Sequence, residues 1–297
     1  MPNVIVGTES GLFRLGDSGG TDLQDRKIPD VALGTSGIWW AIADQNTVLR
    51  KPAGATWEPA VSVPDRRLNC LCPTDTTLFV GTDGAHLLTV DGDTAELARG
   101  FEDAPGRGDW YTPWGGPPAV RSIAVRNESI FVNVHVGGIL HSEDGGESWS
   151  PTIDIHSDVH EVVVSEDDTI FAATAYGLAL SRDGGRSWEF DDGGLHATYA
   201  RAVAVSGEWV LMTASVGPRG GEAALYRRTM EKPGFEKIHN GLPEWFPHNL
   251  DTGCVAARDG VVCFGARDGR VFVSEDDGDN WEQMAEGLPS INKVALE

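Results

Sequence analysis

Arginine and histidine recur at a nearly constant spacing in the middle of this 297-residue chain. Arg121, His160 and Arg201 follow one another at intervals of 39 and 41 residues. An arginine guanidinium can donate two parallel hydrogen bonds to a carboxylate or phosphate, and a neutral imidazole beside positive charge has a lowered pKa and can accept a proton. These residue types could bind a polar ligand or perform base catalysis if the fold brings them together.

Three interpretations of these residues remain open: hydrogen bonding to the backbone of neighbouring elements, ligand binding without reaction, and catalysis by a glycosidase-like or lyase-like mechanism. For catalysis we expect the two imidazoles as bases and a tyrosine as proton donor, which gives His160, His135 and Tyr199. For ligand binding we expect guanidinium, carboxylate, imidazole and indole groups around the same opening, which gives Arg121, Arg201, Asp251, His248, Trp110 and Trp114.

A metal site is a further hypothesis, although the spacing matches no recognised metal signature. His156, Asp158 and His160 alternate along one extended segment, and His135 and His196 could approach from neighbouring repeats. Imidazoles with a carboxylate suit Zn, Mn or Fe. The sequence therefore predicts no metal ligands, with His135, His160 and His196 as the alternative set and a divalent metal as the only cofactor hypothesis; no other cofactor is indicated.

The elements that must position these residues are marked by a repeated motif, Ser-x-Asp-x-Gly-x-Ser/Thr-Trp. Close copies occupy residues 142–149, 181–188 and 274–281, at intervals of 39 and 93 residues. The Ser hydroxyl and Asp carboxylate can bind local backbone amides, and Gly supplies a positive φ, so each copy predicts a tight hairpin turn. A period near 40 residues made of short strands indicates a β-propeller with one four-stranded blade per repeat.

This motif resembles the Asp-box, or BNR repeat, of sialidases, sortilin-type receptors, xyloglucanases and photosystem assembly factors of the Ycf48 type. The resemblance implies that the motif joins the third and fourth strands of a blade on the face opposite the ligand site, so that its acidic residues are structural. It also suggests that Arg121, Arg201 and Arg267 could correspond to the carboxylate-binding arginines of sialidases. The segments 134–138 and 158–161 are most similar to bacterial sialidase-like BNR-repeat proteins, a resemblance that implies no particular reaction.

Alignment on the motif predicts an all-β fold, a single seven-bladed β-propeller over residues 1–297. The C-terminal strand, residues 291–297, is expected to complete the N-terminal blade and close the ring, which is the usual way in which a propeller avoids an exposed edge there. The expected blades are residues 291–297 with 1–26, then 27–64, 65–104, 119–156, 157–196, 197–247 and 248–290.

Because the inner strands of a propeller begin around one mouth of the central channel, their first residues should converge there. Two long connections, residues 99–118 and 229–250, should lie on the same face and carry several aromatic side chains. They could form a lid over a ligand or cover an apolar inner surface.

Composition narrows the choice of partners and compartment. A formal net charge of −22 makes nucleic acid and anionic membranes poor partners, and no apolar run is long enough to span a membrane. The start of the chain has no signal-peptide pattern, which predicts a cytoplasmic protein. The four cysteines lack metal-ligand spacing and are expected to be buried, reduced thiols.

The sequence therefore predicts that the propeller binds a small polar or sugar-like ligand in a central pocket opposite the motif turns. Cleavage of this ligand remains an open alternative. A hydrolase or lyase, including a metal-dependent hydrolase, is the enzymatic form of this hypothesis. The alternative is a non-catalytic scaffold that binds or assembles a protein partner.

Overall fold

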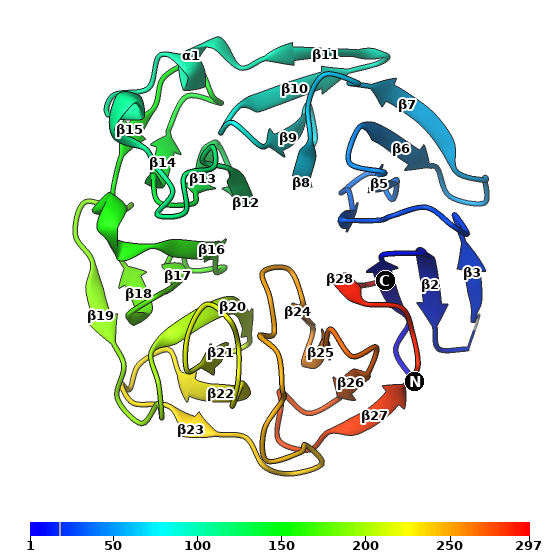
Figure 1. Cartoon of the computed structure of the whole chain (residues 1–297), viewed down its shortest axis with the longest axis vertical. Helices are drawn as coiled ribbons and strands as arrows, with labels where there is room; N and C mark the ends of the chain where they lie inside the picture. The colour runs from blue at the N-terminus through cyan, green and yellow to red at the C-terminus, as the bar shows by residue number, and fades with distance from the viewer. Residues whose placement is uncertain (18) are drawn as a thin grey trace.

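The computed structural model describes residues 1–17 and 19–297. Within these residues the strands form seven four-stranded antiparallel sheets around a common axis, as Figure 1 shows. The predicted seven-bladed β-propeller is therefore confirmed. Each sheet runs from an inner strand at the axis to an outer strand at the rim, so the first residues of all inner strands lie around one end of the axis.

The first three blades come from the N-terminal part of the chain and its tail. Blade 1 contains β28 (Ile291–Leu296), β1 (Val4–Thr8), β2 (Gly11–Leu15) and β3 (Gly20–Asp22). Blade 2 contains β4 (Asp30–Leu33), β5 (Trp39–Ala43), β6 (Thr47–Lys51) and β7 (Glu58–Ser62). Blade 3 contains β8 (Leu68–Pro73), β9 (Leu78–Thr82), β10 (Leu87–Asp91) and β11 (Thr94–Leu97).

The other four blades follow in chain order. Blade 4 contains β12 (Val120–Arg126), β13 (Ser129–Val134), β14 (Gly138–Ser142) and β15 (Ser150–Pro151). Blade 5 contains β16 (Val159–Val164), β17 (Ile170–Thr174), β18 (Gly177–Ser181) and β19 (Glu189–Asp191). Blade 6 contains β20 (Tyr199–Ser206), β21 (Trp209–Ser215), β22 (Ala224–Thr229) and β23 (Glu236–Lys237). Blade 7 contains β24 (Val255–Arg258), β25 (Val261–Gly265), β26 (Val271–Ser274) and β27 (Glu282–Ala285).

The tail closes the ring by supplying the inner strand of blade 1. β28 pairs antiparallel with β1, with Val294 opposite Val6 and Leu296 opposite Val4. The two ends of the chain lie close together in Figure 1. Closure in this way pairs one edge of β1 that would otherwise be open to another chain.

The core lies between neighbouring sheets and not within any one of them. Phe264 and Phe272 of blade 7 pack in one cluster with Leu225 of blade 6, and Phe131 of blade 4 packs with Ile170 of blade 5. The middle strands therefore have both faces covered, which explains their nearly continuous apolar sequences. Their burial is the main stabilising contribution to the ring.

The motif turns join the third and fourth strands of blades 4, 5 and 7. In blade 4, Ser142 Oγ accepts the amide hydrogen of Gly146 at 2.8 Å, and Asp144 Oδ1 accepts that of Ser148 at 2.9 Å. The Trp149 indole donates to the Gly146 carbonyl at 3.0 Å and is 4% exposed. The same serine and aspartate contacts recur in the other two copies. The motif residues thus satisfy the turn backbone and lock it against the blade.

The described helices are single turns in the connections: α1 (Arg99–Glu102), η1 (Arg107–Asp109) and η2 (Ile155–Ser157). No described helix has the length and apolar character needed to cross a bilayer. The first long connection covers blade 4, because Phe101 packs edge-on against Trp149 with ring centroids 5.2 Å apart.

The four cysteines are free thiols in two blades. Cys70 and Cys72 belong to β8, Cys254 immediately precedes β24, and Cys263 lies in β25. Burial raises the pKa of all four thiols, to about 12 for Cys72 and Cys263. They are therefore protonated at neutral pH and weakly nucleophilic.

Candidate ligand site at the upper mouth

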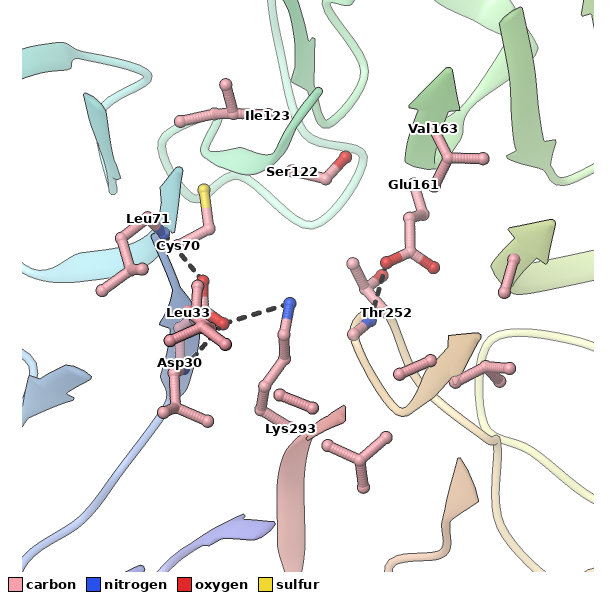
Figure 2. Close-up of a pocket in the computed structure, with 18 of the residues that line it drawn as sticks. Asp30, Leu33, Cys70, Leu71, Ser122, Ile123, Glu161, Val163, Thr252 and Lys293 are labelled. Atoms are coloured by element: carbon pink, nitrogen blue, oxygen red, sulfur yellow. Dashed lines mark hydrogen bonds and ion pairs between the residues drawn. The ribbon is translucent and has the colours of Figure 1, made fainter. Parts of the chain in front are cut away.

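A cavity of about 830 Å³ runs along the axis of the ring and is lined by the inner strands. We call its end at the start of the inner strands the upper mouth; the motif turns lie at the opposite end. Figure 2 shows the polar part of the wall, where side chains from several blades face one another. The labelled polar residues are Asp30, Cys70, Ser122, Glu161, Thr252 and Lys293.

The charged groups of the wall link blades to one another. Lys293 Nζ lies 3.1 Å from Asp30 Oδ1, and the other oxygen of Asp30 accepts the amide hydrogen of Leu71 at 2.7 Å. Blades 1, 2 and 3 are thereby joined at the axis, as the dashed lines in Figure 2 show. Asp30 and Lys293 pair with each other, and Asp30 also accepts a hydrogen bond from the inner-strand backbone. Their role is therefore structural.

Glu161 performs the same task between blades 5, 6 and 7. Its two oxygens accept the amide hydrogens of Val203 and Gly253, each at 2.9 Å. Burial raises the pKa of the Glu161 carboxyl to about 7, although nearby Lys293 and the two amides act in the opposite direction.

The residues at the upper mouth are positioned by irregularities in the inner strands. The pairing register shifts around Arg121 in β12, around His160 in β16 and between Ala200 and Val203 in β20. Such a bulge breaks the alternation of side chains and re-aims the extra residue. Arg121, His160 and Arg201 lie at these shifts, so the repeat spacing noted in the sequence corresponds to a repeated bulge.

Two histidines and one aspartate meet at this mouth. His135 lies in the loop after β13, and Asp158 precedes β16 in a left-handed conformation with φ of 48°. His135 Nε2 is 3.1 Å from Asp158 Oδ1, and His160 Nε2 is 3.6 Å from Asp158 Oδ2. Burial lowers the pKa of both imidazoles, that of His160 to about 3, although Asp158 opposes the shift. Both rings are therefore neutral at pH 7.

Three arginines, Arg121, Arg201 and Arg267, reach the same mouth, and two of them share one carboxylate partner. Asp251 forms ion pairs with both Arg201 and Arg267, the second at 2.7 Å. Within the described part of the chain, Arg121 has no carboxylate partner within ion-pair distance. Burial and the charge of Arg201 lower the pKa of Arg121 to about 10. Arg121 nevertheless keeps its charge at neutral pH, beside another cation.

Aromatic groups complete the cluster. The Tyr199 ring lies against His160 with centroids 4.8 Å apart, and its hydroxyl is 3.4 Å from an Arg201 nitrogen. Trp114 packs over His135 at a centroid distance of 5.0 Å and is 64% exposed. The upper mouth thus brings together seven of the proposed residues, with Trp114 at its surface: Arg121, His135, His160, Tyr199, Arg201, Asp251 and Trp114.

Three other sequence candidates contact other groups. Trp110 packs on Phe101 in the long connection that covers blade 4. His248 is exposed and lies beside Gly220, which belongs to a loop of blade 6. His196 bonds to the Tyr226 hydroxyl at 2.6 Å. In the described residues the group with metal-ligand spacing contains Asp158 in the place proposed for His196. Trp110 and His248 belong to long connections and His196 to an outer-strand loop, outside the inner-strand positions that the repeat aligns.

Apart from Arg121, the sequence candidates did not include residues of the cavity wall. Glu161 and Lys293 each lie directly at a register shift in an inner strand. A signal was present: each is a charged residue within a mostly apolar inner-strand segment, 159–164 or 291–296. A charged residue at such a position indicates an internal partner.

Comparison with known proteins supports the fold. The chain matches no protein-family model and no curated protein sequence. Ycf48 bound to D1 peptide aligns over 94% of this chain and 84% of its own, with 18% identity and a TM-score of 0.61. Virginiamycin B lyase from Staphylococcus aureus aligns over 86% and 83%, with 11% identity and a TM-score of 0.64. A GH74 xyloglucanase from Xanthomonas campestris aligns over 94% of this chain and 46% of its own, with 15% identity and a TM-score of 0.63. At these identities the likeness extends to the propeller fold alone.

Proposed function

We propose that this propeller binds a small polar ligand bearing a carboxylate or phosphate at the upper mouth. The observation that carries the proposal is Arg121, a mostly buried guanidinium with no ion-pair partner among the described residues and with Arg201 nearby. A buried charge without a partner is costly, and an anionic ligand would supply the missing counter-charge.

The surrounding groups suit such a ligand. Arg201 and Arg267 are held by Asp251 and so present their guanidinium groups in a defined arrangement. Exposed Trp114 offers an apolar face to a sugar-like ring, and Tyr199 adds a hydroxyl. Because His135 and Tyr199 lie at the same mouth, cleavage of the ligand by a hydrolase or lyase reaction is the catalytic form of this proposal.

The test is ligand-induced thermal stabilisation with defined probes. We would compare citrate, D-glucuronate and inorganic phosphate with neutral glucose. A ligand at 100 times its Kd stabilises the folded state by about 2.7 kcal/mol, which is a readily measured rise in Tm. At least one anionic probe should raise Tm, and glucose at the same concentration should raise it less.

The variant Arg121→Gln should abolish this stabilisation, because it removes the unpaired guanidinium. Arg126→Gln is the matched control: Arg126 lies at the far end of the same strand and pairs with Asp168 on the surface. Equal Tm shifts in Arg121→Gln and wild type would refute the proposal.

A second candidate is a protein-binding scaffold. Four exposed apolar side chains, Tyr111, Trp114, Tyr176 and Val216, lie in loops on the face of the upper mouth. The motif turns favour membership among the Asp-box propellers, and the Ycf48 structure with D1 peptide is an example of a propeller that binds a protein segment. If this second candidate is right, binding of the protein partner should be lost in Tyr176→Ser and retained in Arg121→Gln.

A further inference from the structure

The cluster of His135, Asp158 and His160 has unusual hydrogen-bond chemistry. His160 is fully buried, and its Nδ1 lies 2.7 Å from the carbonyl oxygen of Ala200. Because a carbonyl oxygen only accepts hydrogen bonds, His160 must carry a hydrogen on Nδ1. In the neutral ring the lone pair is then on Nε2, the atom that faces Asp158.

Two hydrogen-bond acceptors therefore face each other in a buried place. His160 Nε2 and Asp158 Oδ2 are 3.6 Å apart, and His160 Nε2 has no hydrogen-bond partner among the described residues. Asp158 Oδ1 also has no hydrogen-bond partner among these residues, although His135 Nε2 lies 3.1 Å from it. Unsatisfied acceptors of this kind are costly, and a cation between them removes the cost.

The distances suit a metal ion. In a tetrahedral zinc site with bonds of about 2.0–2.1 Å, neighbouring ligand atoms lie about 3.3–3.4 Å apart. The two contacts to Asp158, 3.1 and 3.6 Å, lie on either side of this value. The candidate ligand atoms of all three residues lie within 4.8 Å of one another.

The surroundings also match those of a metal-bound imidazole. Such a ring usually donates its other N–H group to a carbonyl or carboxylate that orients it, which the Ala200 carbonyl does for His160. The ligands come from two blades, His135 from blade 4 and the other two from blade 5, and His135 is itself 2% exposed. A metal ion would therefore join two blades at the upper mouth.

We propose that His135 Nε2, His160 Nε2 and the Asp158 carboxylate form a binding site for a divalent transition metal of the Zn²⁺ class. Two imidazoles and one carboxylate are suitable ligands for Zn²⁺, Co²⁺, Mn²⁺ and Fe²⁺, and three protein ligands leave a position open toward the mouth. Arg121 and Arg201 contribute positive charge nearby, so an anion or hydroxide is the expected fourth ligand. The metal site stands independently of the proposed anion binding, since its ligands are all protein atoms.

The experiment uses metal ions alone as probes. The full-length protein is treated with a chelator, exchanged into chelator-free buffer and titrated with Co²⁺, whose visible absorption distinguishes four-coordinate from hydrated ions. We expect saturation at one Co²⁺ per chain with a four-coordinate spectrum, and displacement of Co²⁺ by Zn²⁺. Failure of the folded wild-type protein to give a saturable spectrum would overturn the proposal.

Variants decide whether these residues are the ligands. His160→Gln and Asp158→Asn should each weaken Co²⁺ binding by at least about 100-fold, because losing even an outer-shell partner costs about 10–100-fold. His239→Gln, a change of an exposed histidine on the rim, should bind like wild type. If His160→Gln does not fold, judged by circular dichroism, His135→Gln in the neighbouring blade provides the same test. Unchanged affinity in the folded ligand variants would refute the assignment.

One further comparison separates this proposal from the proposed function. Arg121→Gln should retain Co²⁺ binding while losing stabilisation by anions. Loss of Co²⁺ binding in this folded variant would contradict the independence of the two sites, whereas failure of every anionic probe would leave the metal result unaffected.

Discussion

At the scale of single residues, burial changes the chemistry of a side chain most where no partner compensates it. His141 in β14 stacks on Phe131 with ring centroids 4.2 Å apart, and its Nε2 is buried without a hydrogen-bond partner among the described residues. Burial lowers the pKa of the His141 imidazole below 6.5, an effect that Glu143 opposes and Arg186 reinforces. At neutral pH the folded protein therefore holds the His141 ring in its neutral form.

This predicts a contribution of His141 to acid sensitivity. As the pH falls below about 6.5, the unfolded chain binds a proton at this site before the folded chain does, so the free energy of unfolding falls. His141→Phe keeps the stacking and should make the decline between pH 7 and pH 5 shallower, by up to about 1.4 kcal/mol per pH unit. Urea unfolding at several pH values measures it. His239→Gln should keep the wild-type slope, and an unchanged slope in His141→Phe would contradict the argument.

At the scale of elements, the motif turns are local structures whose polar groups satisfy one another. Ser274 Oγ accepts the Gly278 amide hydrogen at 2.9 Å and donates to Asp276 at 2.7 Å, and Ser274 is 1% exposed. The contacts depend only on residues a few positions apart. Each turn is therefore encoded in its own eight residues.

Removal of the Ser274 hydroxyl should destabilise the protein measurably. Ser274→Ala leaves a turn amide and a carboxylate without their partner, at an expected cost of about 1–3 kcal/mol. The equivalent changes Ser142→Ala and Ser181→Ala lie in other blades, so the three effects should add to within about 0.5 kcal/mol. Denaturant unfolding measures this, with exposed Ser150→Ala as the control. A triple variant as stable as wild type would show that the turns contribute nothing.

The same local encoding explains how far the sequence alone leads. The turn motif and its period predict the blades because every blade repeats the same frame. The convergence of Arg121, His160 and Arg201 is predictable for the same reason, since each occupies an equivalent inner-strand position.

Residues outside the common frame could not be placed in this way. Trp110 and His248 belong to long connections that have no counterpart in the other blades, so repeat alignment carries no information on their direction. Asp158 is a candidate from its alternation with His160, but the extended segment expected there is not formed, since Asp158 has a φ of 48° and follows directly after η2.

At the scale of the whole molecule, the ring is held at its axis by few polar contacts. Lys293 from the tail strand pairs with Asp30, whose side chain is 4% exposed. The pair connects the last strand of the chain to blade 2 across the point of closure. Loss of the ammonium would leave a carboxylate buried without its counter-charge.

Lys293→Met should therefore destabilise the protein by about 3–5 kcal/mol. Lys27→Met is the matched control, because Lys27 pairs with Glu9 at 3.0 Å on the exposed surface, where such pairs contribute about 0–1 kcal/mol. Equilibrium unfolding in urea measures both. Equal effects of the two substitutions would mean that the axial pair has no special role in closure.

The distribution of the thiols has a consequence for how opening of the ring can be followed. One pair of cysteines belongs to blade 3 and the other to blade 7, the neighbour of the blade completed by the tail. Cys70, Cys254 and Cys263 are buried, and thiols react as thiolates, so alkylation of these three depends on local separation of strands. The natural protein thus carries two chemical reporters, and their relative labelling rates tell which part of the circle gives way first.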